Sequence, residues 1–72
     1  MKSEFKKISI IGLGLIGTSI LHAIYARKKE AVTTFAYDEN SKHRDIVSEM
    51  KIATFVCDDI HDAVYDADLV IL

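Results

Sequence analysis

An apolar run followed by three closely spaced glycines is the feature that most constrains this chain. Residues 7–23 have the sequence KISIIGLGLIGTSILHA, in which Gly12, Gly14 and Gly17 follow a GxGxxG spacing. The β-branched isoleucines before the first glycine are typical of a strand buried in a parallel sheet. Apolar residues then recur at helical spacing and predict one packed helix face, made of Ile16, Ile20, Ala23 and Ile24. The segment therefore predicts a strand, a tight turn and a helix in direct succession.

The three glycines suit a turn that holds a phosphate group. Gly12 would allow the tight turn, Gly14 would let the backbone approach a pyrophosphate, and Gly17 would permit close contact between helix and strand. The amides of Leu15, Ile16 and Gly17 would lie in the first helical turn, where N–H groups lack intrahelical acceptors and favour an anion. The glycine spacing alone is weak evidence for a phosphate site. The flanking strand and helix patterns favour a pyrophosphate site over the alternative, in which the three glycines only form a turn and bind no ligand.

An acidic residue lies about 20 positions after the glycines, where a dinucleotide site commonly binds a ribose. Residues 32–37 are predicted to form the second strand, and Asp38 follows it directly. A carboxylate there would accept hydrogen bonds from the free 2′-hydroxyl of NAD and repel the 2′-phosphate of NADP. Lys42 and Arg44 weaken this preference slightly. The alternative interpretation of Asp38 is a turn or helix-cap residue, and the upstream glycines favour the ribose.

Strand-like and helix-like segments alternate along the chain. We predict strands at 7–12, 32–37, 53–56 and 68–72, and helices at 15–28, 41–50 and 59–66. This alternation indicates a parallel sheet with crossover helices. The predicted fold class is α/β, a partial Rossmann-type doubly wound sheet of four strands in the order 3-2-1-4 with three helices. Ser41 and Asp59 are the predicted N-caps of the second and third helices, and residues 27–31 are a soft boundary.

Length and composition restrict the classes of protein to which the chain could belong. Seventy-two residues make at most one small domain, and 50% hydrophobic with 28% charged residues is a globular composition. A net charge of −2 gives no reason to expect nucleic acid as a partner. We expect no intrachain disulfide from a single cysteine, and no signal peptide or membrane span from the hydropathy pattern. A cytoplasmic location is therefore expected.

Other chemistry-bearing residues do not predict a further site. Metal-ligand atom types occur together in one short window, which holds Cys57, Asp58, Asp59 and His61. Structural zinc sites need four ligands from spaced pairs, so we expect no metal site, and we expect no catalytic residue in the chain. His22 is expected to pack or lie partly exposed. His43 would lie near the predicted ribose site, where contact with an adenosine is conceivable and a surface role is favoured.

The last predicted strand has an unusually apolar sequence. Residues 69–72 are Leu-Val-Ile-Leu, which suits a strand buried on both faces. In the predicted strand order this segment lies beside the first strand, where it would form an exposed apolar edge. We therefore expect the chain to be a fragment of a larger dinucleotide-binding protein and to self-associate through this edge, as a homo-oligomer.

Three segments resemble the prephenate and arogenate (cyclohexadienyl) dehydrogenase family. They are IIGLGLIGTS, AYDEN after the second strand, and DAVYDADLVIL at the end. Leu15 and Ile16 between the second and third glycines differ from hydroxyacid dehydrogenases and pyrroline-carboxylate reductases, which more often have methionine at the second of these positions. The resemblance covers nearly the whole chain but only part of the family's first domain.

The resemblance implies an oxidoreductase of tyrosine biosynthesis that catalyses oxidative decarboxylation with NAD. Residues 1–72 would form the N-terminal part of its dinucleotide-binding domain, without the remainder of that domain or the helical substrate and dimerisation domain. Because the family's catalytic serine and histidine lie beyond the fourth strand, the fragment alone is expected to be inactive. The cofactor-binding residues carried over by resemblance are Gly12, Gly14, Leu15, Ile16, Gly17 and Asp38. Thr18 departs from the family's usual glycine, as does the glycine-free link before the second strand.

Two alternatives remain open at this point. The chain could be a non-catalytic nucleotide-binding or self-associating module from a truncated gene. It could also belong to another Rossmann-type dehydrogenase, because the fold alone does not determine the substrate.

Overall fold

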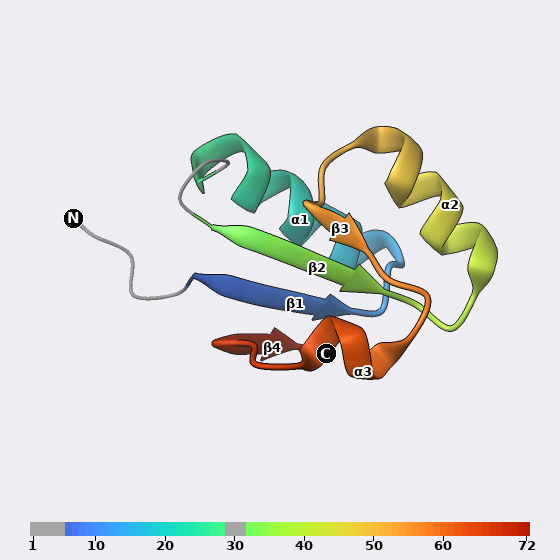
Figure 1. Ribbon diagram of the computed structural model, residues 1–72. Helices are drawn as coiled ribbons and strands as arrows, with labels where there is room; N and C mark the ends of the chain where they lie inside the picture. Colours follow the sequence, from blue (N-terminus) through green and yellow to red (C-terminus); the bar gives the residue numbers. More distant parts are fainter. Residues whose placement is uncertain (1–5, 29–31) are drawn as a thin grey trace.

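The computed structural model describes residues 6–28 and 32–72, which form one parallel sheet with helices on both faces (Figure 1). The elements are β1 (Lys7–Ile11), α1 (Leu15–Lys28), β2 (Thr33–Tyr37), α2 (Ser41–Met50), β3 (Phe55–Val56), α3 (Ile60–Val64) and β4 (Leu69–Ile71). The strand order is β3-β2-β1-β4, and all pairings are parallel. The structure confirms the predicted α/β class, the strand order 3-2-1-4 and, in the described residues, the three helices.

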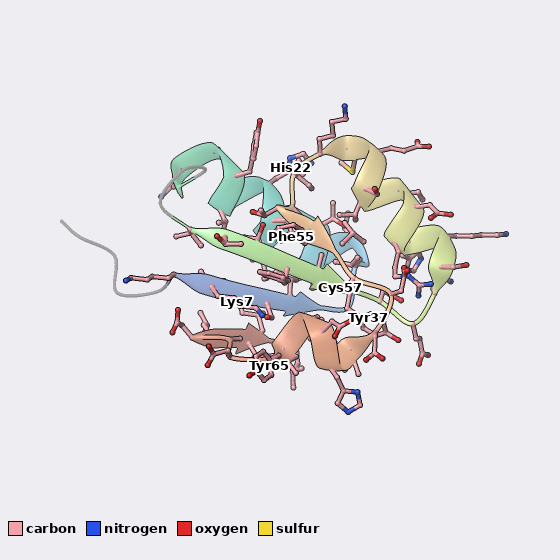
Figure 2. The ribbon with its side chains drawn as sticks, viewed as in Figure 1. Lys7, His22, Tyr37, Phe55, Cys57 and Tyr65 are labelled. Carbon is pink, nitrogen blue, oxygen red and sulfur yellow. The ribbon has the colours of Figure 1, made fainter. Side chains whose placement is uncertain are left out.

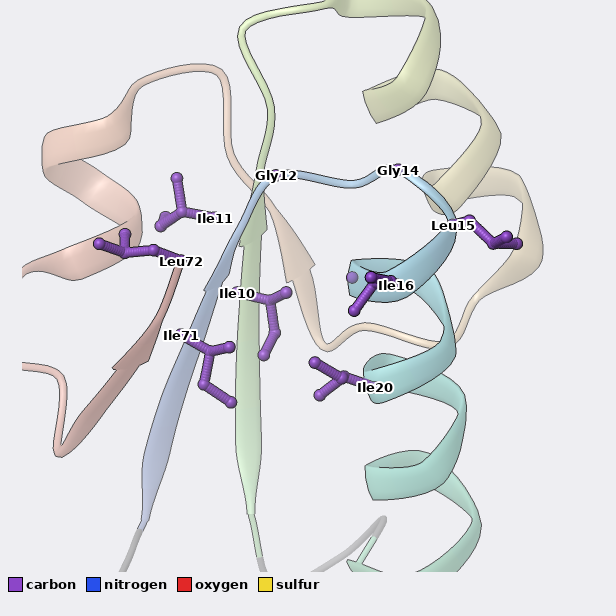
Figure 3. A pocket seen from close by; sticks show the side chains of 10 residues that line it. Ile10, Ile11, Gly12, Gly14, Leu15, Ile16, Ile20, Ile71 and Leu72 are labelled. Atoms are coloured by element: carbon purple, nitrogen blue, oxygen red, sulfur yellow. The ribbon is translucent and has the colours of Figure 1, made fainter.

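The helices divide between the two faces of the sheet. Figures 1 and 3 place α1 and α2 on one face and α3 on the other, as the right-handed crossover rule requires when the chain reverses direction across the sheet. The parallel register brings the carboxyl ends of β1 and β2 together, with Ile11 opposite Tyr37. The loops that follow these two strands therefore lie next to each other at one edge of the sheet.

The hydrophobic core lies mainly between the sheet and the helices α1 and α2. Its buried members are Ile8, Ile10, Leu13, Leu21, Val32, Ala36, Val47 and Ile52. β1 is covered on both faces, since Ser9 between the two buried isoleucines is also fully buried. The Ser9 hydroxyl donates to the Ala63 carbonyl of α3, so the polar atom on that face is satisfied.

The buried face of α1 differs from the predicted one. Leu21 is fully buried, whereas Ile16 and Ala23 are exposed, so including these two in the packed face was wrong. The reason is the direct contact of Gly17 with the turn after β1, which directs the next residues at helical spacing, Leu21 and Ile24, toward the sheet. Ile20 packs at the border of the core, as predicted.

Several element ends also differ from the predictions. Asn40, and not Ser41, caps α2, because its side-chain oxygen accepts from the Lys42 amide at 2.9 Å. Asp59 caps α3 as predicted and accepts from the His61 amide at 2.7 Å. α3 ends at Val64, before Asp66, which has a left-handed φ of 58°. The predicted soft boundary at residues 27–31 falls partly outside the described residues.

β3 is shorter than predicted because side chains replace part of its ladder. The Thr34 amide donates to Thr54 Oγ1 at 3.0 Å, and the Thr54 amide donates to Thr34 Oγ1 at 2.9 Å. These reciprocal bonds hold residue 54 beside β2 without backbone pairing.

In the described part of the chain, no helix is long and apolar enough to cross a membrane.

β4 forms one edge of the described sheet, and Asp68, which precedes it, forms hydrogen bonds with the start of β1. Asp68 Oδ2 accepts from the amides of Lys6 and Lys7, both at 2.8 Å, and the Asp68 amide donates to the Lys7 carbonyl at 2.9 Å. The Lys7 amide, followed by the Lys6 amide, lowers the pKa of Asp68. Leu69 and Val70 remain partly exposed on this edge.

Candidate functional site

The turn after β1 has the geometry that the glycine spacing predicts. Gly12 has a φ of +98°, a conformation that disfavours other residues, and its amide donates to the Tyr37 carbonyl at 2.8 Å. A Cβ added at Gly17 would lie 1.9 Å from the Gly12 carbonyl oxygen. α1 therefore packs directly on the turn, and only glycine at position 17 allows this approach.

Gly14 is surrounded by open space at the start of α1. A Cβ added there would meet no atom within 4 Å, so nothing in the described residues sterically requires glycine at this position. The Thr18 amide donates to the Gly14 carbonyl at 3.0 Å as the first bond of the helix. Helix geometry leaves the preceding amides, those of Leu15, Ile16 and Gly17, without intrahelical acceptors. Such a helix start favours an anion.

Leu13 fixes the middle of the glycine turn. Its side chain is 4% exposed and packs in the core, while its amide donates to Asp38 Oδ2 at 2.6 Å. Its carbonyl accepts from Thr18 Oγ1 at 3.3 Å. Neither Leu13 nor Thr18 was predicted from the sequence to be part of the site. The hydrophobic position between the first two glycines was the available signal for Leu13.

Asp38 joins the glycine turn to the turn after β2. Its Oδ1 accepts from the Asn40 amide at 2.8 Å, and its Oδ2 lies 3.2 Å from His43 Nδ1 and also accepts from Leu13. The pKa of Asp38 is lowered, and the hydrogen bond from the Asn40 amide is the largest cause. Burial raises this pKa, while the Leu13 amide and His43 lower it further. Asp38 therefore stabilises the turn after β2, and its hydrogen bonds favour the ionised carboxylate.

Two cavities meet at the glycine turn. The first, of about 520 Å³, lies between α1 and the ends of β1 and β4 and is almost wholly apolar. Figure 3 shows Ile10, Ile20 and Ile71 gathered in this space, while the exposed side chain of Leu15 points away from it. The second cavity, of about 350 Å³, is lined by Ile11, Gly12, Tyr37, Asp38, Glu39 and Ile60. Ile11 and Gly12 line both cavities, so the two spaces adjoin across the turn.

Arg44 connects the two loops beside the second cavity. Its Nη1 donates to the Asp38 carbonyl at 2.7 Å, and its Nε lies 3.6 Å from Asp58 Oδ1 in the loop after β3. Its guanidinium also lies 5.8 Å from the centre of the Tyr37 ring. The positive charge of Arg44 is thus partly balanced by Asp58, a contact that was not predicted from the sequence.

The other candidate residues lie apart from the turn. His22 is exposed on α1, while Cys57 is half-buried and its amide donates to the Ala36 carbonyl at 2.8 Å (Figure 2). Burial, with the nearby Asp62 carboxylate, raises the pKa of the Cys57 thiol. Within residues 6–28 and 32–72, no group of three or more His, Cys, Asp or Glu side chains is placed to hold a metal ion.

The chain is similar in sequence to a curated dehydrogenase. No family model matches the chain. A curated protein from Zymomonas mobilis, named cyclohexadienyl dehydrogenase, is 47% identical to the chain over 68 residues. This match covers 94% of the chain but only 23% of the relative, so the chain spans less than a quarter of that protein's length.

Proposed function

The chain belongs to the cyclohexadienyl (prephenate and arogenate) dehydrogenase family, and from that premise we propose that it forms the NAD-binding portion of such an enzyme. The proposed contacts are the amides of Leu15, Ile16 and Gly17 to the pyrophosphate, across the turn made by Gly12 and Gly14, and Asp38 to a ribose. The reaction proposed for the enzyme is the oxidative decarboxylation of prephenate or arogenate, in which the nicotinamide accepts a hydride.

The observation that carries the proposal is the open space at Gly14. Gly12 is required by its positive φ and Gly17 by its contact with Gly12, but the described residues offer no steric reason for glycine at position 14. A group that fills this space must come from outside the described structure. A pyrophosphate suits the position because first-turn amides and the helix dipole stabilise negative charge there.

The two cavities suit the two halves of a dinucleotide. The cavity beside Asp38 and Tyr37 has the polar edge that a ribose and its base need, and we assign the adenosine to it. The apolar cavity on the other side of Gly12 is assigned to the nicotinamide half. The Asp38 carboxylate would accept from a ribose hydroxyl and repel a 2′-phosphate, so NAD is favoured over NADP.

The chemical step is assigned to residues outside this chain. Among the described residues that line the two cavities there is no cysteine, serine or threonine to act as a nucleophile, and the half-buried Cys57 lines neither cavity. We therefore expect the 72 residues alone to bind NAD without oxidising a substrate. Self-association through the β4 edge and a cytoplasmic location remain predictions.

Calorimetric titration with NAD tests the proposal through the variant Gly14→Val. A valine side chain occupies the space assigned to the pyrophosphate, while the absence of neighbours within 4 Å lets the fold accept it. We expect wild-type protein to bind NAD saturably and Gly14→Val to lose at least a hundredfold in affinity. Ala23→Val is the matched control, because it adds the same side chain to an exposed position of the same helix and should bind as wild type does.

Two results would contradict the proposal. One is the absence of NAD binding by wild-type protein at millimolar concentration, which would favour a module that only self-associates. The other is equal NAD affinity in Gly14→Val and wild type, which would exclude the glycine turn as the phosphate site. Circular dichroism of each variant shows whether a loss of binding reflects unfolding.

A further inference from the structure

His43 is in direct contact with the carboxylate assigned to the ribose. Its Nδ1 lies 3.2 Å from Asp38 Oδ2, the oxygen that also accepts from the Leu13 amide. An ionised carboxylate can only accept hydrogen bonds, so Nδ1 carries a proton and donates. The His43 side chain is 42% exposed and that of Asp38 is 13% exposed. A change of charge on His43 would therefore act on Asp38 at contact distance.

The other charged side chains around this pair are carboxylates, an ammonium group and a guanidinium. Glu39 lines the same cavity as Asp38, and Lys42 lies beside His43 in the first turn of α2. Arg44 is bound to the Asp38 carbonyl and to Asp58, and the loop after β3 contributes no further cation to the pair. Imidazole side chains, in contrast, gain a proton between pH 8 and 5. His43 is thus the residue that can switch the net charge at the ribose end.

We propose that His43 is a specificity-determining residue, whose protonation reduces the repulsion between Asp38 and a 2′-phosphate and so weakens the preference for NAD over NADP at low pH. This inference rests on the proposed dinucleotide function. In its neutral form His43 adds no positive charge beside the Asp38 carboxylate, which then repels a 2′-phosphate. In its cationic form the pair has no net charge, and the phosphate is tolerated.

The expected size of the effect follows from Coulomb's law. A unit charge roughly 6 Å from a phosphate, at an effective dielectric constant of about 40 for a half-exposed site, changes the affinity about tenfold. NAD has no charged group at this position, so its affinity should change much less. The ratio of the two dissociation constants, NADP over NAD, is therefore the quantity to measure.

The test is a set of calorimetric titrations with NAD and NADP at pH 8 and pH 6, on wild type, His43→Asn and His22→Asn. Asparagine retains a hydrogen-bond donor for Asp38 but cannot become charged. A phosphate monoester itself titrates near pH 6, and this contribution is common to all three proteins. We expect the NADP/NAD ratio of dissociation constants to fall about tenfold more between pH 8 and pH 6 in wild type and His22→Asn than in His43→Asn.

An equal pH dependence of that ratio in His43→Asn and wild type would overturn the inference while leaving the dinucleotide function intact. No binding of either nucleotide by wild type would overturn both. A second measurement needs no variant: NMR titration of the imidazole signals should give a higher midpoint for His43 with NADP bound than with NAD bound, because binding linkage is reciprocal. Equal midpoints would also refute the role of His43.

Discussion

Replacing Gly17 with alanine should separate the packing role of the glycine turn from its binding role. The new methyl carbon would lie 1.9 Å from the Gly12 carbonyl oxygen and 3.1 Å from its carbon. Real Cβ contacts are longer than 3.0 Å, so α1 must move from the turn by at least about 1 Å. Overpacking of this kind costs about 1–3 kcal/mol, and the upper end applies because the neighbour is backbone.

The intrinsic preference of helices for alanine opposes this cost. Alanine is more favourable than glycine inside a helix by about 1 kcal/mol. Subtracting this gain from a packing cost of about 3 kcal/mol leaves a net destabilisation of about 2 kcal/mol for Gly17→Ala. Gly14→Ala is the matched control, because its methyl group meets nothing within 4 Å. It should change the free energy of unfolding by less than about 1 kcal/mol.

The assay is urea unfolding of the chain followed by circular dichroism, with the free energy of unfolding extrapolated to water. We expect the free energy of unfolding of Gly17→Ala to be lower than that of Gly14→Ala by more than about 1 kcal/mol. If the two variants were equally stable, the close contact between α1 and the Gly12 carbonyl would not exist in solution. A strongly destabilised Gly14→Ala would instead mean that the space at Gly14 is filled by the chain itself.

Two further predictions concern α1 and the β4 edge. Leu21→Ala should lower the free energy of unfolding by about 3 kcal/mol because Leu21 is fully buried. Leu15→Ala on the same helix should change it by less than about 0.5 kcal/mol because Leu15 is 86% exposed. Similar urea midpoints for the two variants would contradict this prediction. The amides of Lys7 and Lys6 lower the pKa of Asp68 in the folded state, so its carboxylate stabilises the fold above the unfolded pKa and this contribution is lost as pH falls through the folded pKa. Below about pH 4, the free energy of unfolding should therefore fall less steeply with pH in Asp68→Asn than in wild type. Parallel curves of stability against pH for the two proteins would refute the role of this carboxylate.

The order of the elements could be predicted from the sequence because each carries its own local signal. The isoleucines before Gly12 predict β1, the alternation predicts a parallel sheet, and the strand order follows from the doubly wound arrangement that the glycine motif indicates. The prediction for α1 was less accurate. Ile16 and Ala23 fit the helical period as well as Leu21 does, and only the contact of Gly17 with Gly12 decides which side of the helix faces the sheet.

The contacts that hold the candidate site together could not be predicted in the same way. Leu13, Thr18 and Arg44 act through partners 25, 5 and 6 residues away, and their roles depend on where the turns bring the atoms. Ser41 and Asn40 are both common N-caps, and the backbone of the turn after β2 selects Asn40. Sequence patterns predicted the glycines and Asp38 as candidate site residues, whereas the bonds around them required the structure.

Under the proposed function, the hydrogen bond from Leu13 to Asp38 would influence which ligand the turn selects. The Leu13 amide donates to Asp38 Oδ2 at 2.6 Å, so the carboxylate lies directly beside the turn that leads into α1. Groups that are already fixed lose little conformational entropy when a ligand binds. A free phosphate would use only the amides, and a free nucleoside only the carboxylate. A molecule that carries both a diphosphate and a ribose at the matching distance would use both, and we therefore propose that the arrangement favours a dinucleotide over either part.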